Sequence, residues 1–312
     1  MRRKRNLISN FAHCFNTWRE FRRYPGLFSL SDALQNWQAV LLPGRITHRA
    51  AGRALAREAA IRTLPGGVHE VRVLKPDLLF YWLGAADNNL HYVIDQEFNP
   101  GFPHCYTTPP IHLTPQSLVL DVGACEGLFA FRVVRQNCAA RVICFEPSVT
   151  NIRYARQAAE ANGVADRVRF EPVAVSRVSG KVRFLEQADK PDSHSIQTAD
   201  EAGPSVDGVS LDDYCATHEL KLGARDLIKV DAEGSDLDVL LGAERLIRAG
   251  APQIAVTTYH KPEHAAQMVD WLKGVQPQYR LRLKGFASWT PTPTPVLLQA
   301  AMPLGARGSL VC

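Results

Sequence analysis

The sequence predicts an α/β fold in which a seven-stranded, mostly parallel sheet is flanked by helices and preceded by a mainly helical amino-terminal extension. Beyond residue 115, short apolar runs alternate with helical stretches. A glycine-rich turn at 123–127 follows the first run and opens a helix. Before residue 115, apolar residues recur mainly at helical spacing. Alternating strands and helices are typical of a parallel sheet that is covered on both faces.

The amino-terminal region begins with an apolar stripe at helical spacing, formed by Leu7, Phe11, Phe15 and Trp18. We expect a helix that packs this stripe onto the body of the protein. The alternative is a basic amphipathic helix whose residues 1–23 lie on an anionic membrane surface. Further along, we expect helices over 29–65 with a break at Pro43-Gly44, a strand at 69–74 and a helix at 88–98.

A connector with four prolines, 101–115, separates the two regions, so we place the boundary between 1–115 and 116–312. The seven strands expected in the second region are 118–122, 142–145, 168–175, 226–230, 254–258, 279–283 and 295–299. The last helix is expected to start at Pro262. The polar segment 186–209 is expected to be a loop, either a lid over the substrate or a surface insertion.

Charge and cysteine content argue against several classes of function. Residues 1–28 hold seven Lys or Arg and one Glu, and the rest of the +5 chain is close to neutral, so we expect no nucleic-acid partner. The seven cysteines are scattered without a Cys-x-x-Cys pair, which predicts free thiols, a cytoplasmic location and no zinc site. The sequence also lacks the roughly 18-residue apolar run of a membrane span.

The glycine-rich turn has the context of a nucleotide-binding site. It reads Asp121-Val-Gly123-Ala124-Cys125-Glu126-Gly127, between a buried strand and a helix. Glu146 ends the next strand, where a carboxylate can accept hydrogen bonds from both ribose hydroxyls. We also assign Pro147 and Ala174, near the ends of the second and third strands, to the cofactor site.

The charges around the turn discriminate between adenosine cofactors. The spacing is Gly-x-x-x-Gly, so the Gly-x-Gly-x-x-Gly pattern that cradles a pyrophosphate is incomplete. Asp121 and Glu126 add negative charge, which favours the sulfonium and ammonium groups of S-adenosylmethionine over a dinucleotide. A nicotinamide-dependent oxidoreductase is the weaker alternative.

Candidate catalytic residues follow the fourth and fifth strands. Asp231 and Glu233 come after the fourth strand, and His260 after the fifth, at the edge where ligands bind such sheets. Asp231 or His260 could accept a proton from an acceptor hydroxyl, although a lone histidine is often structural. We expect Asp236 to cap the following helix and His264 to lie on a helix surface. His260 and His264 have the spacing of the two histidines in a zinc-protease motif. Because Lys261 stands where that motif carries glutamate, we expect no metal site.

Three ordered motifs resemble those of the FkbM family of methyltransferases. They are the turn from Asp121 to Gly127, then Phe145-Glu146-Pro147, and then Ile228-Lys229-Val230-Asp231-Ala232-Glu233-Gly234. The run Tyr259-His260-Lys261-Pro262-Glu263 is similar to one branch of the family. The resemblance covers roughly residues 70–300. Cys125 departs from the family pattern, which usually has asparagine there.

This resemblance implies a Rossmann-like class I methyltransferase core, S-adenosylmethionine as cofactor and O-methylation of a sugar, glycan or natural-product hydroxyl. It also implies that Glu146 binds the ribose and that Asp231 lies near the methyl-transfer centre. A different class of function stays open at this point, namely a non-catalytic protein that docks at the inner membrane face through its basic helix.

Overall fold

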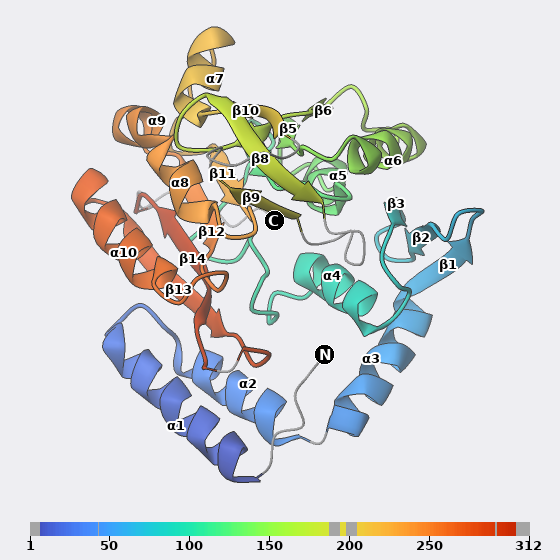
Figure 1. Ribbon diagram of the computed structural model, residues 1–312, viewed down its shortest axis with the longest axis vertical. Helices are drawn as coiled ribbons and strands as arrows, with labels where there is room; N and C mark the ends of the chain where they lie inside the picture. The colour runs from blue at the N-terminus through green and yellow to red at the C-terminus, as the bar shows by residue number, and fades with distance from the viewer. Residues whose placement is uncertain (1–6, 43, 187–193, 198–204, 291, 304–312) are drawn as a thin grey trace.

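The computed structural model describes residues 7–42, 44–186, 194–197, 205–290 and 292–303. Its central element is a seven-stranded sheet in the order β13-β14-β12-β11-β4-β5-β6 (Figure 1). The strands are β4 (Leu118–Val122), β5 (Arg141–Phe145), β6 (Val168–Glu171), β11 (Leu227–Val230), β12 (Gln253–Thr257), β13 (Arg280–Phe286) and β14 (Pro295–Ala301). In this sheet β14 runs opposite to the other six strands, which are parallel to one another. The expected Rossmann-like class I sheet is confirmed.

Helices cover both faces of the sheet because each strand is apolar on both sides. In β4, Val119 faces one core while Leu118 and Leu120 face the other. The first face carries α5 (Leu128–Arg135) and α6 (Val149–Ala161), and the second carries α7 (Leu211–Thr217), α8 (Asp236–Leu241), α9 (Glu244–Gly250) and α10 (His264–Val275). Figure 1 shows α8 and α10 on the opposite side of the sheet from α5 and α6.

The amino-terminal region contains strands as well as helices. Its elements are α1 (Leu7–Arg23), α2 (Leu30–Leu41), α3 (Gly44–Glu58), β1 (Ala59–Thr63), β2 (His69–Val73), β3 (Leu78–Trp82) and α4 (Asn88–Phe98). The expectation of helix throughout 29–65 is therefore wrong at its end. The stretch 59–63 pairs antiparallel with β2, which supplies the backbone partners that a local apolar pattern does not reveal.

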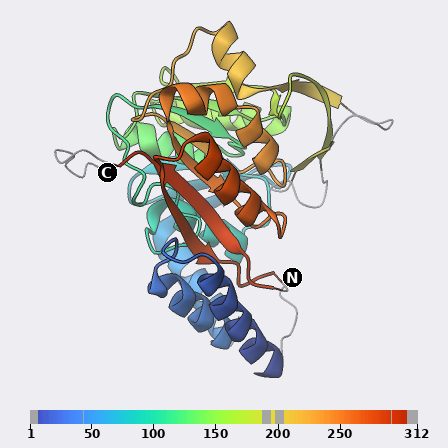
Figure 2. The same cartoon turned by 90° about the vertical axis from the view of Figure 1, so that its left-hand side faces the viewer.

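Helix α1 turns its aromatic stripe outward, contrary to expectation. Phe11 is 61% exposed and Phe15 is 68% exposed, whereas His13 and Thr17 are buried. The side of α1 that faces the protein carries polar residues, and the Thr17 hydroxyl there donates to Asn36 Oδ1 on α2 at 2.9 Å. Figure 2 shows α1 at the rim of the molecule. Among the described residues, the helices are too short or too polar to cross a membrane.

Helix α2 is fixed to the carboxyl-terminal strand pair by polar contacts. Asp32 accepts hydrogen bonds from the backbone N–H groups of Ser29 and Gly285, each at 2.9 Å. Asn36 donates to the carbonyl of Phe286 at 2.8 Å. One apolar core also includes residues on both sides of residue 115, such as Leu90 and Val119. The domain boundary expected near residue 115 stays a prediction.

A small second sheet replaces part of the loop expected at 186–209. It has the order β7-β10-β8-β9, with β7 (Ala174–Val175), β8 (Gly180–Glu186), β9 (His194–Gln197) and β10 (Ser205–Val209). The expected third strand over 168–175 is thus divided between two sheets, as β6 and β7. Residues 187–193 and 198–204 lie outside the described residues, so the lid and the surface insertion stay open as alternatives.

The backbone at Gly123 predicts a steric requirement for glycine. Its φ is +72°, and a Cβ there would lie 1.9 Å from the carbonyl oxygen of Asp231. Gly163 has a similar φ of +65°, but no atom of the described residues lies within 4 Å of the place that its Cβ would take, so it isolates the backbone strain alone. We expect Gly163→Ala to reduce the free energy of unfolding by about 1 kcal/mol. Gly123→Ala should cost more than about 3 kcal/mol, because the backbone must move.

Urea denaturation of both variants measures the difference. Equal losses in the free energy of unfolding of the two variants would show that the close approach of Gly123 to Asp231 tolerates a side chain.

Candidate functional site

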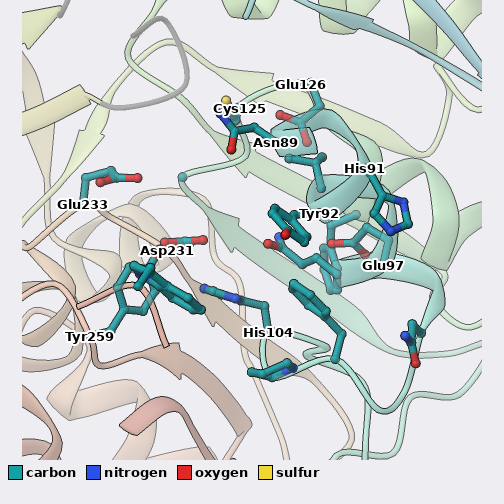
Figure 3. A pocket seen from close by; sticks show the side chains of 18 of the residues that line it. Asn89, His91, Tyr92, Glu97, His104, Cys125, Glu126, Asp231, Glu233 and Tyr259 are labelled. Atoms are coloured by element: carbon teal, nitrogen blue, oxygen red, sulfur yellow. The ribbon is translucent and has the colours of Figure 1, made fainter. Parts of the chain in front are cut away.

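A cavity of about 1340 Å³ opens at the carboxyl ends of β4, β5 and β11. The sheet edge supplies one wall, through the turn at 122–126, residues 145–147 and the segment 231–233. Helices α2, α3 and α4, with residues 99–104, supply the opposite wall. Seven carboxyl side chains and one lysine line the cavity. Figure 3 shows several of these carboxylates pointing into the same space. An acidic lining of this kind suits a cationic ligand.

Glu146 holds the glycine-rich turn through hydrogen bonds with backbone N–H groups. Its Oε2 accepts a hydrogen bond from the Cys125 N–H at 3.0 Å, and its Oε1 accepts one from the Ser148 N–H at 2.9 Å. Burial raises the pKa of Glu146 to about 7, although these two hydrogen bonds lower it in part. The carboxylate therefore titrates near neutral pH. Burial likewise raises the pKa of Glu126 to about 7.

The structure brings most of the expected cofactor residues to the cavity wall. Those in the lining are Gly123, Ala124, Cys125, Glu126, Glu146 and Pro147. Asp121, Gly127 and Ala174 were also expected there but do not line the cavity. Asp121 and Ala174 are buried within strands, and Gly127 begins α5 with a φ of +79°. Val173 and Val175, the neighbours of Ala174, line the cavity in its place.

Asp121 forms a buried ion pair with Lys229, its register partner on β11. The Lys229 Nζ lies 2.8 Å from Asp121 Oδ1 and donates to the carbonyl of Gly123 at 2.9 Å. Burial alone would lower the pKa of Lys229, but the carboxylates of Asp121 and Asp231 raise it above its ordinary value. The Lys229 ammonium thus joins the glycine-rich turn to β11.

Asp231 lies at the end of β11 with its carboxylate in the cavity (Figure 3). The Tyr106 hydroxyl donates to its Oδ2 at 2.7 Å, and the Thr257 Oγ1 lies 3.3 Å from its Oδ1. Tyr106 belongs to the connector before residue 115, in which sequence analysis found no functional residue. Tyr106, which is fully buried, therefore orients Asp231 from the connector.

His260 lies beside Asp231, Glu233 and Asp236. Its Nδ1 is 2.9 Å from Asp236 Oδ2, and its Nε2 is 3.7 Å from Asp231 Oδ1 and 3.5 Å from Glu233 Oε2. Burial lowers the pKa of His260, but the three carboxylates outweigh this effect and raise it to about 9. The three residues expected to be catalytic are thus brought together.

Asp236 does more than cap a helix. Its fully buried carboxylate accepts hydrogen bonds from the Ala232 and Gly234 N–H groups and from the Thr257 hydroxyl, at 2.8, 3.1 and 2.9 Å. It therefore shapes the loop that carries Asp231 and Glu233. The surface position expected for His264 is wrong, because His264 is buried at the start of α10 with its Nδ1 3.8 Å from Asp236 Oδ2. Helix α10 also begins at His264 rather than at Pro262.

Aromatic side chains on the cavity wall escaped the sequence analysis. His104 stacks on Trp289 with ring centroids 5.6 Å apart and meets the Tyr259 ring edge-on at 5.0 Å. Burial lowers the pKa of His104 to about 4, so its ring is neutral at neutral pH. These residues are far apart in sequence and show no periodicity. The only local signal was that Phe102, Pro103, His104 and Tyr106 lie close together in the connector.

The residues present fit S-adenosylmethionine. Gly123 leaves the turn without a side chain where the backbone approaches β11. The buried Glu146 carboxylate in the cavity lining matches the hydroxyl donors of a ribose. The acidic lining complements the sulfonium and ammonium charges and opposes a pyrophosphate.

Comparison with known proteins supports the same cofactor class. Residues 121–281 match the model of the FkbM methyltransferase domain. The chain is 31% identical over 150 residues to the 2-O-methyltransferase NoeI of Sinorhizobium fredii (strain NBRC 101917 / NGR234), over 43% of this chain and 60% of NoeI. It is 28% identical over 216 residues to the AMB antimetabolite synthetase AmbE of Pseudomonas aeruginosa, over 58% of this chain and 10% of AmbE.

The chain therefore spans less than two thirds of either relative. Among solved structures, a methyltransferase FkbM from Methylobacillus flagellatus KT aligns with 82% of this chain and 59% of its own, at a TM-score of 0.46 and 18% identity.

Proposed function

Since the chain belongs to the FkbM methyltransferase family, we propose that it transfers the methyl group of S-adenosylmethionine to a hydroxyl of a sugar, glycan or natural product. Family membership favours the methyl donor over the nicotinamide alternative. The name of NoeI, a 2-O-methyltransferase, supports an oxygen acceptor. The acceptor class is a proposal, because the chain spans 60% of that relative.

The observation that carries this proposal is the acidic cavity at the carboxyl edge of β4, β5 and β11. S-adenosylmethionine supplies a methyl group on a sulfonium, which is a good leaving group. The protein's task is then to align an acceptor oxygen with that methyl group and to exclude competing geometries. The cavity is large enough to extend from the glycine turn to α2 and α4, which leaves room for an acceptor beside the cofactor.

For the cofactor, we assign the turn from Gly123 to Glu126 to the adenosyl and methionine moieties and Glu146 to the ribose hydroxyls. Asp121 and Gly127 support this turn from outside the cavity, through Lys229 and through the start of α5. Pro147 and the neighbours of Ala174 form the adjacent apolar wall.

For the methyl transfer, we assign Asp231 to the acceptor hydroxyl. Tyr106 already donates to one of its oxygens and holds the carboxylate in the cavity. His260 has a pKa near 9, so at neutral pH it carries a proton and is a poorer base than Asp231. The Glu233 side chain is 34% exposed, and we assign its carboxylate to contact with the acceptor.

The first prediction concerns cofactor affinity and pH. Because the pKa of Glu146 is raised to about 7, the carboxyl is neutral below that pH and loses acceptor capacity. We expect the Kd of S-adenosylhomocysteine, measured by calorimetry, to rise about tenfold between pH 8 and pH 6. Glu146→Gln should bind weakly at both values with a much smaller pH dependence. Wild-type affinity in Glu146→Gln would remove Glu146 from the ribose site.

The second prediction tests methyl transfer itself. With labelled S-adenosylmethionine and a panel of hydroxylated sugars, we expect Asp231→Asn to reduce transfer about 100-fold or more. Its affinity for S-adenosylhomocysteine should change far less. Asp238→Asn, a half-buried carboxylate outside the cavity lining, is the matched control and should retain transfer. Transfer by Asp231→Asn at the wild-type rate would contradict the assigned role.

We also propose a peripheral membrane contact through α1. Phe11 and Phe15 are exposed, and the spacing of Arg19 and Arg22 places them on the same side of the helix. Exposed aromatic side chains followed by basic ones suit an anionic membrane surface. The cytoplasmic location stays a prediction.

A vesicle experiment tests this contact. The wild-type chain should co-sediment with vesicles containing an anionic phospholipid, and Phe11→Ser/Phe15→Ser should lose at least half of the bound fraction. Val178→Ser, at an exposed valine outside α1, should bind as wild type does. Equal binding of both variants would exclude α1 as the contact.

A further inference from the structure

Three side chains at the cavity converge in a way that the methyl-transfer assignment does not require. His260 Nε2 points between Asp231 and Glu233, at 3.7 and 3.5 Å from their nearest carboxylate oxygens. The His260 side chain is only 9% exposed, and within the described part of the chain its Nε2 has no hydrogen-bond partner. Asp231, Asp236 and His260 also form a group whose candidate ligand atoms lie within 4.8 Å of one another.

The distances from His260 Nε2 to the two carboxylates are slightly longer than those between donor atoms around a shared ion. Separations of 3.5 and 3.7 Å are too long for good N–H···O hydrogen bonds. Two ligand atoms that each lie about 2.1 Å from a metal ion are roughly 3.0 to 3.4 Å apart at octahedral or tetrahedral angles. Small side-chain adjustments would therefore bring Asp231, Glu233 and His260 onto one cation.

The second nitrogen of His260 is held as it is in many metal sites. Metal-binding histidines usually donate their other ring N–H to a carboxylate, which fixes the tautomer and the orientation of the ring. Here Nδ1 lies 2.9 Å from Asp236 Oδ2. Asp236 is itself fixed by two backbone N–H groups and by Thr257. His260 thus directs its Nε2 toward Asp231 and Glu233, which line the cavity.

Charge and backbone geometry agree with this arrangement. Three carboxylates, those of Asp231, Glu233 and Asp236, surround His260, so a divalent cation can replace the proton on His260 Nε2 while the carboxylates balance its charge. The nearby Lys229 is bound to Asp121 and Gly123. Glu233 has a φ of +47°, an unusual conformation for a residue with a side chain, and such strain is often found at ligand sites.

We propose that Asp231, Glu233 and His260 bind one divalent transition-metal cation of the Mn²⁺ or Zn²⁺ class, with Asp236 as the positioning residue for His260. The mixed nitrogen and oxygen donors favour these ions over Ca²⁺, which prefers oxygen ligands alone. The inference deepens the proposed function and rests on it. The cation, held in part by Asp231, would lower the pKa of an acceptor hydroxyl, and that proton would leave to solvent, so that Asp231 would act through the cation and not as the base. The oxygen–methyl bond then forms as the sulfur–methyl bond breaks, and the electron pair of that bond goes to sulfur.

Titration of the chelator-treated full chain with Mn²⁺, followed by electron paramagnetic resonance of free Mn²⁺, tests the site. We expect one bound Mn²⁺ per chain, displaced by Zn²⁺. Glu233→Gln and His260→Asn should each weaken Mn²⁺ binding at least tenfold. The control is Glu263→Gln, an exposed carboxylate outside the cluster, which should bind Mn²⁺ as wild type does. Glu233 is partly exposed, so its variant should fold even if His260→Asn does not.

Three results would overturn the proposal, and the first two come from the Mn²⁺ titration. One is the absence of saturable Mn²⁺ and Zn²⁺ binding, and the other is unchanged Mn²⁺ affinity in folded Glu233→Gln. Methyl transfer at the full rate after chelation would also contradict the proposed metal site, while leaving the proposed function intact. If the wild-type chain does not bind S-adenosylhomocysteine, the proposed function is contradicted instead. The metal site is tested separately, because Mn²⁺ binding is measured without cofactor.

Discussion

The ion pair between Asp121 and Lys229 is the interaction on which the site depends. Both side chains are buried, and they are direct register partners on β4 and β11. Burying two charges is costly unless their geometry is good and their remaining hydrogen-bonding capacity is used. Lys229 meets that condition by also donating to the Gly123 carbonyl. Removing either partner would leave an uncompensated charge under the cofactor turn.

A second set of contacts brings the amino-terminal region to the same edge of the sheet. Gln299 on β14 donates to the carbonyls of Tyr106 and Thr108, each at 2.9 Å. Arg132 on α5 forms a buried ion pair with Glu97 on α4 at 3.0 Å. These contacts fix the connector so that Tyr106 reaches Asp231. Asp231, at the end of β11, is therefore held by a residue of the connector as well as by the sheet.

The predictable part of the fold was the part with a strong local pattern. The strands of the central sheet are short apolar runs bounded by turns, and each was found within a few residues of its expected place. The strand at 59–63 was missed because its partners lie in β2, and α1 was oriented wrongly because Thr17 finds Asn36 on another helix. Within the site, Glu146 and Asp231 follow strands and could be expected at the edge. Tyr106 could not, because its contact with Asp231 spans 125 residues of sequence.

The two walls of the cavity have separate origins in the chain. The match to the family model begins at residue 121, whereas α2, α3, α4 and the segment 99–104 all precede it. Substitutions in that earlier segment can reshape the far wall without touching the turn or Glu146. Selection for a new acceptor could therefore proceed on one wall while the other keeps its cofactor chemistry. A lineage with this architecture can diversify its substrates without having to rebuild its catalytic edge.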